Sequence, residues 1–371
     1  MIYLDYNATH PPIPKILNEV NENYLAEFYN PSGATRYSLN NQGKIEESRK
    51  YFSSITGIPE KNIIFSSSGT EANYLLIRFL TQNFINLTSV IVSPFEHPSI
   101  YSALDDHNLT KYILETNKSG VILLDHLEKL LEKHPRPIIC LAVANETGVI
   151  QPSEEIAALA NRYSVPFYSD LMQAFGKQKV NFDLFSGFTF SGHKIGAGMG
   201  ASLTAVRHLT DNTHIFAGGN QENNHRAGTE NWPAIIAFQK ASEYQLEQLE
   251  SKNSKLKRFQ NILEAFLVSQ KCEIIGKNAN RLPNTSFVLL PIEEIDFFLL
   301  GLEEAGVIVS TGSSCKSRAR EASSSLLSMG YTKEEALRCI RISTGIFTTE
   351  DEIHIFCEKA RELLITFGVN H

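Results

Sequence analysis

Apolar residues along this 371-residue chain follow two different spacings, which alternate along its first two thirds. Between residues 62 and 206, short runs rich in β-branched and aromatic residues alternate with stretches in which apolar residues recur every three or four positions. The first pattern predicts buried strands and the second predicts helices. Strands are expected at NIIF (62–65), SVIVS (89–93), KYILE (111–115), PIICLAVA (137–144), VPFYSD (165–170), GFTFS (187–191) and ASLTAV (201–206), with helices near 70–82, 98–107, 123–134 and 153–162.

This alternation predicts an α/β domain built on a mostly parallel, buried sheet. An earlier helix is expected from the helical spacing of Ile13, Leu17, Val20, Tyr24 and Phe28. In open α/β sheets, ligands bind beyond the carboxyl ends of the strands. Several polar residues follow the expected strands directly, so a site is expected at that edge.

The pattern of expected strands and helices changes after about residue 232. A long charged helical stretch (233–258) leads into strands expected near 273–276, 285–290, 307–310 and 338–343. The last helix opens with a capping box, Thr349 to Glu352. Its expected buried face is Ile353, Phe356, Ala360 and Leu363. We therefore expect a large domain over 16–250 and a smaller C-terminal α/β domain over 251–371, joined by the N-terminal segment 1–15.

Composition and charge argue against several classes of protein. With 34 basic and 41 acidic residues the net charge is −7, which argues against a nucleic-acid surface. No apolar run approaches the roughly 18 residues of a membrane span, and MIYLDYNATHPP is no secretion signal. Five widely spaced cysteines without CxxC argue against a disulfide framework or a metal site. A cytoplasmic protein with no membrane or direct nucleic-acid partner is expected.

A lysine follows one of the buried strands directly. The segment FTFSGHKIGAGMG (188–200) places Lys194 among Ser191, His193 and glycines. An amine in a partly desolvated pocket has a lowered pKa and can form a Schiff base. The alternative interpretation is an ordinary exposed loop lysine.

The same segment contains a second pattern. Gly196, Gly198 and Ala201 fit the dinucleotide fingerprint G-x-G-x-x-G/A. That motif needs a strand before it and a helix after it. Because ASLTAV is expected to be a strand, a dinucleotide-binding oxidoreductase is only a distant alternative.

Other polar residues at strand ends have two interpretations each. Asp170 could pair with a protonated pyridine nitrogen, with Gln173 one turn further on, or it could cap a helix. His97 could stack on a cofactor ring and move a proton, or it could cap or pack. Gly69 and Thr70 begin a helix after a Gly/Ser turn, which suits a phosphate as well as ordinary capping.

Ten segments in order resemble the cysteine desulfurase family, which belongs to the class V aminotransferase-like, fold type I enzymes that use pyridoxal phosphate. They are YLDYNATHP (3–11), FYNPSG (28–33), SSGTEANY (67–74), EHPS (96–99), NETGVIQP (145–152), SDLMQAFGK (169–177), SGHKIGAGMG (191–200), GGNQENNHRAGTEN (218–231), STGSSCKSR (310–318) and RISTGIFTTEDEI (341–353). The resemblance implies that Lys194 holds pyridoxal 5'-phosphate covalently and that His97 stacks on its ring and moves protons. Asp170 would pair with the ring nitrogen and Gln173 would contact the ring hydroxyl oxygen.

The resemblance also assigns the remaining binding residues. The phosphate would be held by Gly69, Thr70, Ser191 and His193. Thr229 would reach the phosphate of a neighbouring subunit, which implies a homodimer. Asn145, at the cofactor, and Arg341 would bind the substrate carboxylate, for which the planar guanidinium fork is well suited.

The resemblance makes Cys315 the sulfur acceptor. L-cysteine would lose its sulfur to Cys315 as a persulfide and leave as L-alanine. A protein acceptor would then take the sulfur into iron–sulfur cluster assembly or tRNA thiolation. The remaining cysteines lie in apolar or amphipathic stretches and are expected to be structural: Cys140, Cys272, Cys339 and Cys357.

Other functions on this scaffold stay open. A selenocysteine lyase or a class V aminotransferase is the nearest alternative, although an aminotransferase would not need Cys315. A non-catalytic sulfur-relay or assembly protein could keep the fold, but a decayed site should have lost some of Lys194, Asp170, His97 and Arg341. The stretches GSSC and REASSSLL depart from the family's usual loop, which affects the choice of acceptor more than the chemistry.

Overall fold

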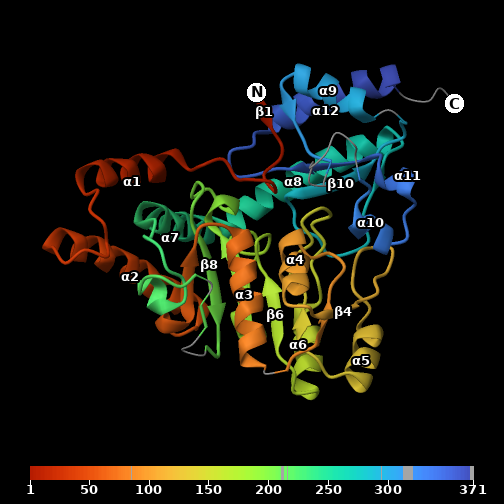
Figure 1. Ribbon diagram of the computed structural model, residues 1–371. Coiled ribbons are helices and arrows are strands. Elements are labelled where there is room, and N and C mark those ends of the chain that lie inside the picture. Colours follow the sequence, from red (N-terminus) through yellow and green to blue (C-terminus); the bar gives the residue numbers. More distant parts are fainter. Residues whose placement is uncertain (85, 210–212, 215, 294, 312–320, 368–371) are drawn as a thin grey trace.

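A seven-stranded sheet forms the centre of the protein, as Figure 1 shows for a computed structural model that describes residues 1–84, 86–209, 213–214, 216–293, 295–311 and 321–367. The strand order is β2-β8-β7-β6-β5-β3-β4. The neighbouring pairs from β7 to β4 are parallel, whereas β8 is antiparallel to both β7 and β2. The strands are β2 (Ile63–Ser66), β3 (Ser89–Val92), β4 (Thr110–Ile113), β5 (Ile138–Ile139), β6 (Phe167–Asp170), β7 (Gly187–Ser191) and β8 (Ser202–Val206). The prediction of a mostly parallel sheet is confirmed.

Strand β5 is much shorter than the predicted run 137–144. It pairs with both neighbours only at Ile138 and Ile139. The N–H of Leu141 donates to the Glu96 carboxylate at 2.6 Å instead of to a neighbouring strand. The N–H groups of Cys140 and Ala142 still donate to backbone oxygens of β6, so the Glu96 side chain replaces a strand partner only at Leu141, which the apolar pattern alone does not reveal.

Helices cover both faces of the sheet. The four predicted helices form as α3 (Gly69–Asn83), α4 (Pro98–Asp106), α5 (Leu124–Lys133) and α6 (Ser153–Arg162). Side chains of β3 alternate, with Val90 and Val92 in the hydrophobic cluster that contains α3 and α4 side chains and Ile91 in the larger cluster on the other side. Both faces are thus buried, as a parallel sheet requires.

Two helices at the N-terminal side differ from the prediction. Helix α1 (Pro14–Ala26) forms, but Tyr24 is 45% exposed and Phe28, which lies beyond the helix, is 65% exposed. Helix α2 (Arg36–Thr56) was not predicted, because its first turns carry mostly polar residues and its deeply buried face includes Asn41 and Ser48 beside the apolar Ile45 and Phe52. In Figure 1 these two helices extend to one side of the sheet.

The C-terminal region has its own sheet and core. The charged stretch 233–258 divides into α7 (Trp232–Glu247) and α8 (Leu249–Ser269). A three-stranded antiparallel sheet has the order β12-β10-β9. The further elements are β9 (Glu273–Ile274), β10 (Thr285–Leu289), α9 (Ile295–Glu304), β11 (Val307–Ile308), α10 (Ser324–Ser328), α11 (Lys333–Ala336), β12 (Cys339–Ser343) and α12 (Glu350–Phe367). The predicted capping box of the last helix forms. Its buried face differs from the prediction in that Cys357 and Leu364 are buried while Leu363 is half-buried.

The first residues of the chain connect the two regions. Strand β1 (Ile2–Tyr3) pairs in parallel with β11, and Ile2 and Leu4 belong to the C-terminal hydrophobic core. The N–H of His10 then donates to the His193 carbonyl at 2.9 Å, next to the large sheet. The division into domains 16–250 and 251–371 stays a prediction. Within the described ranges, no helix combines the length and apolarity that a membrane crossing requires.

Candidate functional site

The predicted site residues gather at one edge of the large sheet. Because β2 and β7 are both antiparallel to β8, they run in the same direction, and β3, β5 and β6 run with them. The carboxyl ends of five strands therefore meet at this edge. Residues that follow these ends are Gly69 and Thr70, His97, Asn145, Asp170 and Gln173, and Ser191, His193 and Lys194.

Lys194 lies in a short 3₁₀ helix, η3 (Gly192–Lys194), directly after β7. Its Nζ donates to the backbone oxygens of Asn7 at 2.7 Å and Ala8 at 2.8 Å. Burial lowers the pKa of the amine to about 8, and the positive charge of Arg341 adds to this effect. Lys194 is therefore not an ordinary exposed loop lysine. A substantial neutral fraction near pH 8 makes it a usable nucleophile.

The motif around Lys194 does not continue as a dinucleotide-binding turn. Strand β8, and not a helix, follows Gly196, Gly198 and Ala201. A dinucleotide fingerprint needs a helix whose N-terminus meets the pyrophosphate. The local structure therefore argues against that alternative.

A hydrogen-bond chain fixes Asp170 and links it to His97. Asp170 is buried at the end of β6 and accepts from Asn73 Nδ2 at 2.9 Å and from the N–H of Met172 at 2.8 Å. Asn73 Nδ2 also donates to Ser99 Oγ at 3.0 Å, and Ser99 Oγ lies 2.7 Å from His97 Nδ1. Hydrogen bonds therefore link side chains of α3, α4 and β6. Asn73, which bonds to both Asp170 and Ser99, was not identified from the sequence.

His97 caps helix α4 through its ring. The N–H of Ser99 donates to His97 Nδ1 at 3.1 Å. Since Nδ1 accepts, the proton of the neutral ring lies on Nε2. The capping role considered from the sequence is therefore real, and Nε2 carries the proton of the neutral ring.

The N-terminus of α3 forms a compact turn. Ser68 caps the helix, and its side chain accepts from the N–H of Glu71. A Cβ added to Gly69 would lie 2.8 Å from Met172 Cε and 3.9 Å from Ser191 Cβ, so the turn approaches the ends of β6 and β7 closely. Exposed Thr70 follows, where unpaired helix N–H groups favour an anion.

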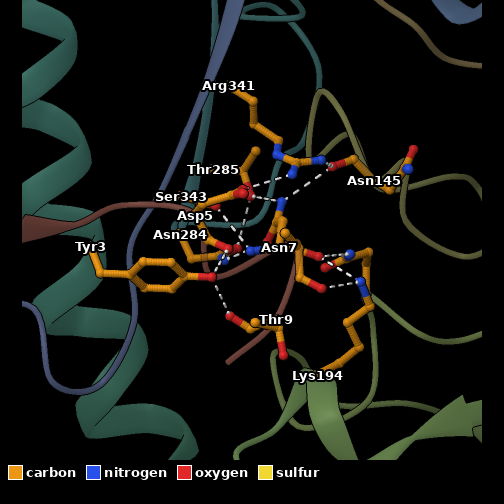
Figure 2. A network of polar contacts seen from close by, with 12 residues as sticks. Tyr3, Asp5, Asn7, Thr9, Asn145, Lys194, Asn284, Thr285, Arg341 and Ser343 are labelled. Atoms are coloured by element: carbon orange, nitrogen blue, oxygen red, sulfur yellow. Dashed lines mark hydrogen bonds and ion pairs between the residues drawn. The ribbon is translucent and has the colours of Figure 1, made fainter. Parts of the chain in front are cut away.

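The N-terminal segment contributes a residue that sequence reasoning did not single out. Figure 2 shows Asn7 at the centre of the polar network. Its backbone oxygen accepts from both Lys194 Nζ at 2.7 Å and Gln173 Nε2 at 2.9 Å. Its side-chain Nδ2 donates to the Asn145 backbone oxygen at 3.2 Å, and its Oδ1 accepts from Lys177 Nζ at 2.9 Å. Asn7 thereby sets the relative positions of three predicted site residues.

Arg341 lies on β12 and reaches the same network (Figure 2). Its Nη2 donates to Asp5 Oδ1 at 2.8 Å and its Nη1 to the Asn145 backbone oxygen at 3.1 Å. The guanidinium is buried, and Nε has no hydrogen-bond partner among the described residues. A buried guanidinium N–H without a protein partner is the feature expected of an arginine that binds a carboxylate.

The structure describes the surroundings of two further predicted residues, His193 and Thr229. His193 Nδ1 lies 3.3 Å from Thr9 Oγ1, and burial followed by repulsion from Lys194 lowers the pKa of its ring to about 4. Exposed Thr229 lines a pocket together with Ser66 and Ser67 of its own chain. Cys315 lies outside the described residues.

The four cysteines that the structure describes are all buried and unbridged. Burial raises the pKa of each thiol, to about 12 for Cys272 and Cys339, to about 11 for Cys357 and well above the ordinary value for Cys140. Thiols of this kind stay protonated and unreactive. The residues described form no group of three or more His, Cys, Asp or Glu that could hold a metal ion.

Glu96, next to His97 in the chain, is a third residue that the motifs did not reveal. Its Oε1 accepts from Leu141, while Oε2 is buried and has no hydrogen-bond partner among the described residues. Burial, and then the charge of Asp170, raises the pKa of this carboxyl well above its usual range. The side chain is therefore held neutral beside the Asp170 carboxylate.

Replacing Glu96 by glutamine should change how stability depends on pH. The unfolded wild type loses the Glu96 proton above about pH 4.3, whereas the folded protein keeps it, so stability falls by about 1.4 kcal/mol per pH unit until the folded pKa is passed. Glu96→Gln cannot ionise and should gain stability relative to wild type between pH 5 and pH 8, as measured by denaturant unfolding. Exposed Glu132→Gln is the control, and an advantage that does not change with pH would contradict the account.

Pyridoxal phosphate, the group that the resemblance implies, fits these residues. Lys194 offers an amine of lowered pKa, and the buried Asp170 carboxylate lies near enough to influence that pKa. The turn at Gly69 begins helix α3 beside the ends of β6 and β7, where free helix N–H groups suit a phosphate. Amine, carboxylate and helix N-terminus are the donor set that such a cofactor requires.

Comparison with known proteins shows which family this chain is similar to. A family model described as aminotransferase class-V matches residues 2–356. A cysteine desulfurase of Nostoc sp. is 32% identical over 372 residues, covering 98% of this chain and 93% of that protein. The X-ray structure of a NifS-like protein from Rickettsia africae has a TM-score of 0.88 at 32% identity and covers 98% of this chain and 99% of that one. A structure described as SspA in complex with cysteine has a TM-score of 0.79 at 25% identity, covering 94% and 100% of the two chains.

Proposed function

This chain belongs to the class V aminotransferase family and is a cysteine desulfurase, and we propose that it transfers the sulfur of L-cysteine to Cys315 and releases L-alanine. The observation that carries the proposal is the half-buried Lys194 amine, with its pKa near 8, at the carboxyl edge of the sheet. Relatives named cysteine desulfurase that align over nearly the whole chain support the choice of substrate.

Lys194 would hold pyridoxal phosphate through its amine. The cofactor, when bound, would draw electrons from the α-carbon of the substrate. Asp170, fixed by Asn73, would keep the ring nitrogen protonated, and Gln173 Nε2 would face the ring hydroxyl. The N-terminus of α3, with Gly69 and Thr70, would hold the phosphate together with Ser191 and His193.

Arg341 would bind the substrate carboxylate, with Asn145 beside it. Its partnerless Nε supports this role. Changing Arg341 to glutamine should raise the KM for L-cysteine by roughly 10- to 100-fold, because a hydrogen bond to a charged group contributes about 1.5–3 kcal/mol. Steady-state kinetics measures this. Arg338→Gln, three residues earlier, should leave KM unchanged, and an unchanged KM in Arg341→Gln would contradict the assignment.

Sulfur transfer would require a thiolate at Cys315. The thiolate would attack the substrate sulfur, so that an S–S bond forms and the carbon–sulfur bond breaks with its electron pair left on the β-carbon. That carbon would take up a proton and become the methyl group of alanine. His97, fixed through Nδ1 by Ser99, would move a proton between the cofactor and the substrate.

A second copy of this chain is the proposed structural partner. Helices α1 and α2 and the link between them expose a set of large apolar side chains on one side of the molecule: Tyr24, Leu25, Phe28, Tyr37 and Leu39. The rings of Phe28, Tyr29 and Tyr37 stack on one another, with centroids 4.9 and 4.7 Å apart. Sedimentation equilibrium should therefore give twice the chain mass, and a monomer would contradict this part of the proposal.

The reaction products distinguish the proposal from its alternatives. With L-cysteine and a reductant, alanine and sulfide should form in equal amounts. A class V aminotransferase would instead need an oxo-acid acceptor and would give an oxo acid, and a selenocysteine lyase would turn over selenocysteine but little cysteine. A sulfur-relay protein would give none of these products. The final sulfur acceptor is proposed to be a protein of iron–sulfur cluster assembly or of tRNA thiolation.

A further inference from the structure

An acidic residue lies in the first turn of α3, the helix whose N-terminus is proposed to hold the cofactor phosphate. Glu71 is the third residue of this helix and directly follows Thr70. Its Oε2 accepts from the N–H of Ser67 at 2.8 Å and from Ser67 Oγ, so the carboxyl group turns back toward the residues that precede the helix. Only 12% of the side chain is exposed, so water and salt screen its charge weakly.

The Glu71 carboxyl is negatively charged. Burial raises its pKa, but hydrogen bonds from Arg226 and Ser67 outweigh that effect and lower the pKa below its usual value. A carboxylate in the first turn stabilises a helix, because it interacts favourably with the positive end of the helix dipole. A phosphate at the same helix end uses the same dipole, so the two negative groups repel each other unless a positive charge offsets one of them.

Arg226 supplies that positive charge from a distant part of the chain. Its Nε donates to Glu71 Oε1 at 2.7 Å, and only 18% of the arginine side chain is exposed. Arg226 lies three residues before Thr229, in the segment between η4 (Gln221–Asn224) and α7. The ion pair therefore joins this segment to the first turn of α3.

The segment that brings Arg226 to α3 is itself held on the large sheet. Glu222 accepts from Arg49 Nη1 at 2.8 Å and from Arg49 Nη2 at 3.0 Å, and both side chains are buried. Glu222 also accepts from the N–H of Phe65, on β2, at 2.8 Å. Because Glu222 has Arg49 as its own partner, the charge of Arg226 is left to offset Glu71.

We propose that Arg226 is a positioning residue for the cofactor phosphate: by pairing with Glu71 it offsets the negative charge in the first turn of α3 and lets a phosphate bind there. The inference rests on the proposed site for pyridoxal phosphate. It assigns Arg226 an effect on the phosphate that acts through Glu71 and not through a contact of its own.

Cofactor affinity of the full-length protein, freed of cofactor and titrated with pyridoxal phosphate, measures this effect. Arg226→Met should raise the dissociation constant by roughly 10-fold, the scale of one uncompensated charge at a helix N-terminus. The double variant Arg226→Met with Glu71→Gln should return to within about threefold of wild type, because both charges are then absent and the two changes are coupled.

Arg78→Met is the matched control for the loss of an arginine. Arg78 is also on α3, but it lies about 10 Å further along the helix axis than Glu71. Its replacement should leave the dissociation constant for pyridoxal phosphate unchanged. A wild-type constant in Arg226→Met, or an equal rise in Arg78→Met, would refute the role of the Arg226–Glu71 pair.

Pyridoxal, which has the same ring and aldehyde but no phosphate, separates the electrostatic role from a structural one. Its dissociation constant in Arg226→Met should equal that of the wild type. An equal loss of affinity for pyridoxal and pyridoxal phosphate would show a distorted site, and a double variant as weak as Arg226→Met would show a direct contact with the phosphate; either result overturns the proposal. Failure of the wild type to hold pyridoxal phosphate on Lys194 would instead refute the proposed function.

Discussion

Replacing Lys194 by alanine is expected to abolish covalent attachment of pyridoxal phosphate and to lower alanine formation from L-cysteine by about 10³-fold or more, the scale seen when a covalent catalytic group is removed. Lys194 combines a position after β7 with a pKa near 8, which gives a neutral amine at working pH. Lys177 lies close by, but its Nζ is bound to Asn7 and Gln173, so it is not placed to substitute. Absorbance of the cofactor and borohydride fixation measure the effect.

The matched control for this change is Lys179→Ala. That lysine is exposed and pairs with Glu250 on the surface. It should keep the yellow cofactor and full activity. Lys194→Ala should remain folded, because it removes a half-buried amine whose charged form is disfavoured by burial. If borohydride still fixed the cofactor in folded Lys194→Ala, another amine would carry it and the site would have been misassigned.

Replacing Cys315 by serine is expected to lower sulfide formation by about 10²-fold or more while leaving pyridoxal phosphate bound, because a hydroxyl is a far weaker nucleophile toward sulfur than a thiolate. The spectrum of the bound cofactor should still respond when L-cysteine is added, since Arg341 and Lys194 are intact. Turnover under reductant, followed for alanine and sulfide together, measures the loss.

The other cysteines serve as controls. Cys357→Ala, in helix α12, should keep full turnover because burial holds the pKa of its thiol near 11. Cys140, Cys272 and Cys339 are likewise buried. Wild-type rates of sulfide formation in Cys315→Ser would show that the sulfur is accepted elsewhere.

Much of the fold could be predicted because the central strands are short, continuous apolar runs. Asp170 and Lys194 end up at one edge because each directly follows a strand, and parallel strands bring their carboxyl ends together. Helix α2 could not be predicted in the same way, since its opening turns are polar and its burial comes from packing on α7. Phe28 followed a helical spacing yet lies outside the helix and is exposed.

The connections between site residues were not predictable. Asn7 lies 187 positions before Lys194 and 170 before Lys177, and only the tertiary structure brings them together. Its contacts with Lys194 and Gln173 use a backbone oxygen, which no residue pattern encodes. The neutral state of Glu96 likewise follows from burial near Asp170, since the sequence EHPS shows only an acid beside a histidine.

The most direct test of the central claim is the mass of the Cys315 peptide after the holoenzyme reacts with L-cysteine without a reductant. The account predicts one added sulfur atom on Cys315, removable by dithiothreitol, and one alanine released for each persulfide formed. Alanine without sulfur on Cys315, or sulfur on another cysteine, would contradict it. Absence of alanine from a protein that holds pyridoxal phosphate on Lys194 would refute cysteine as the substrate.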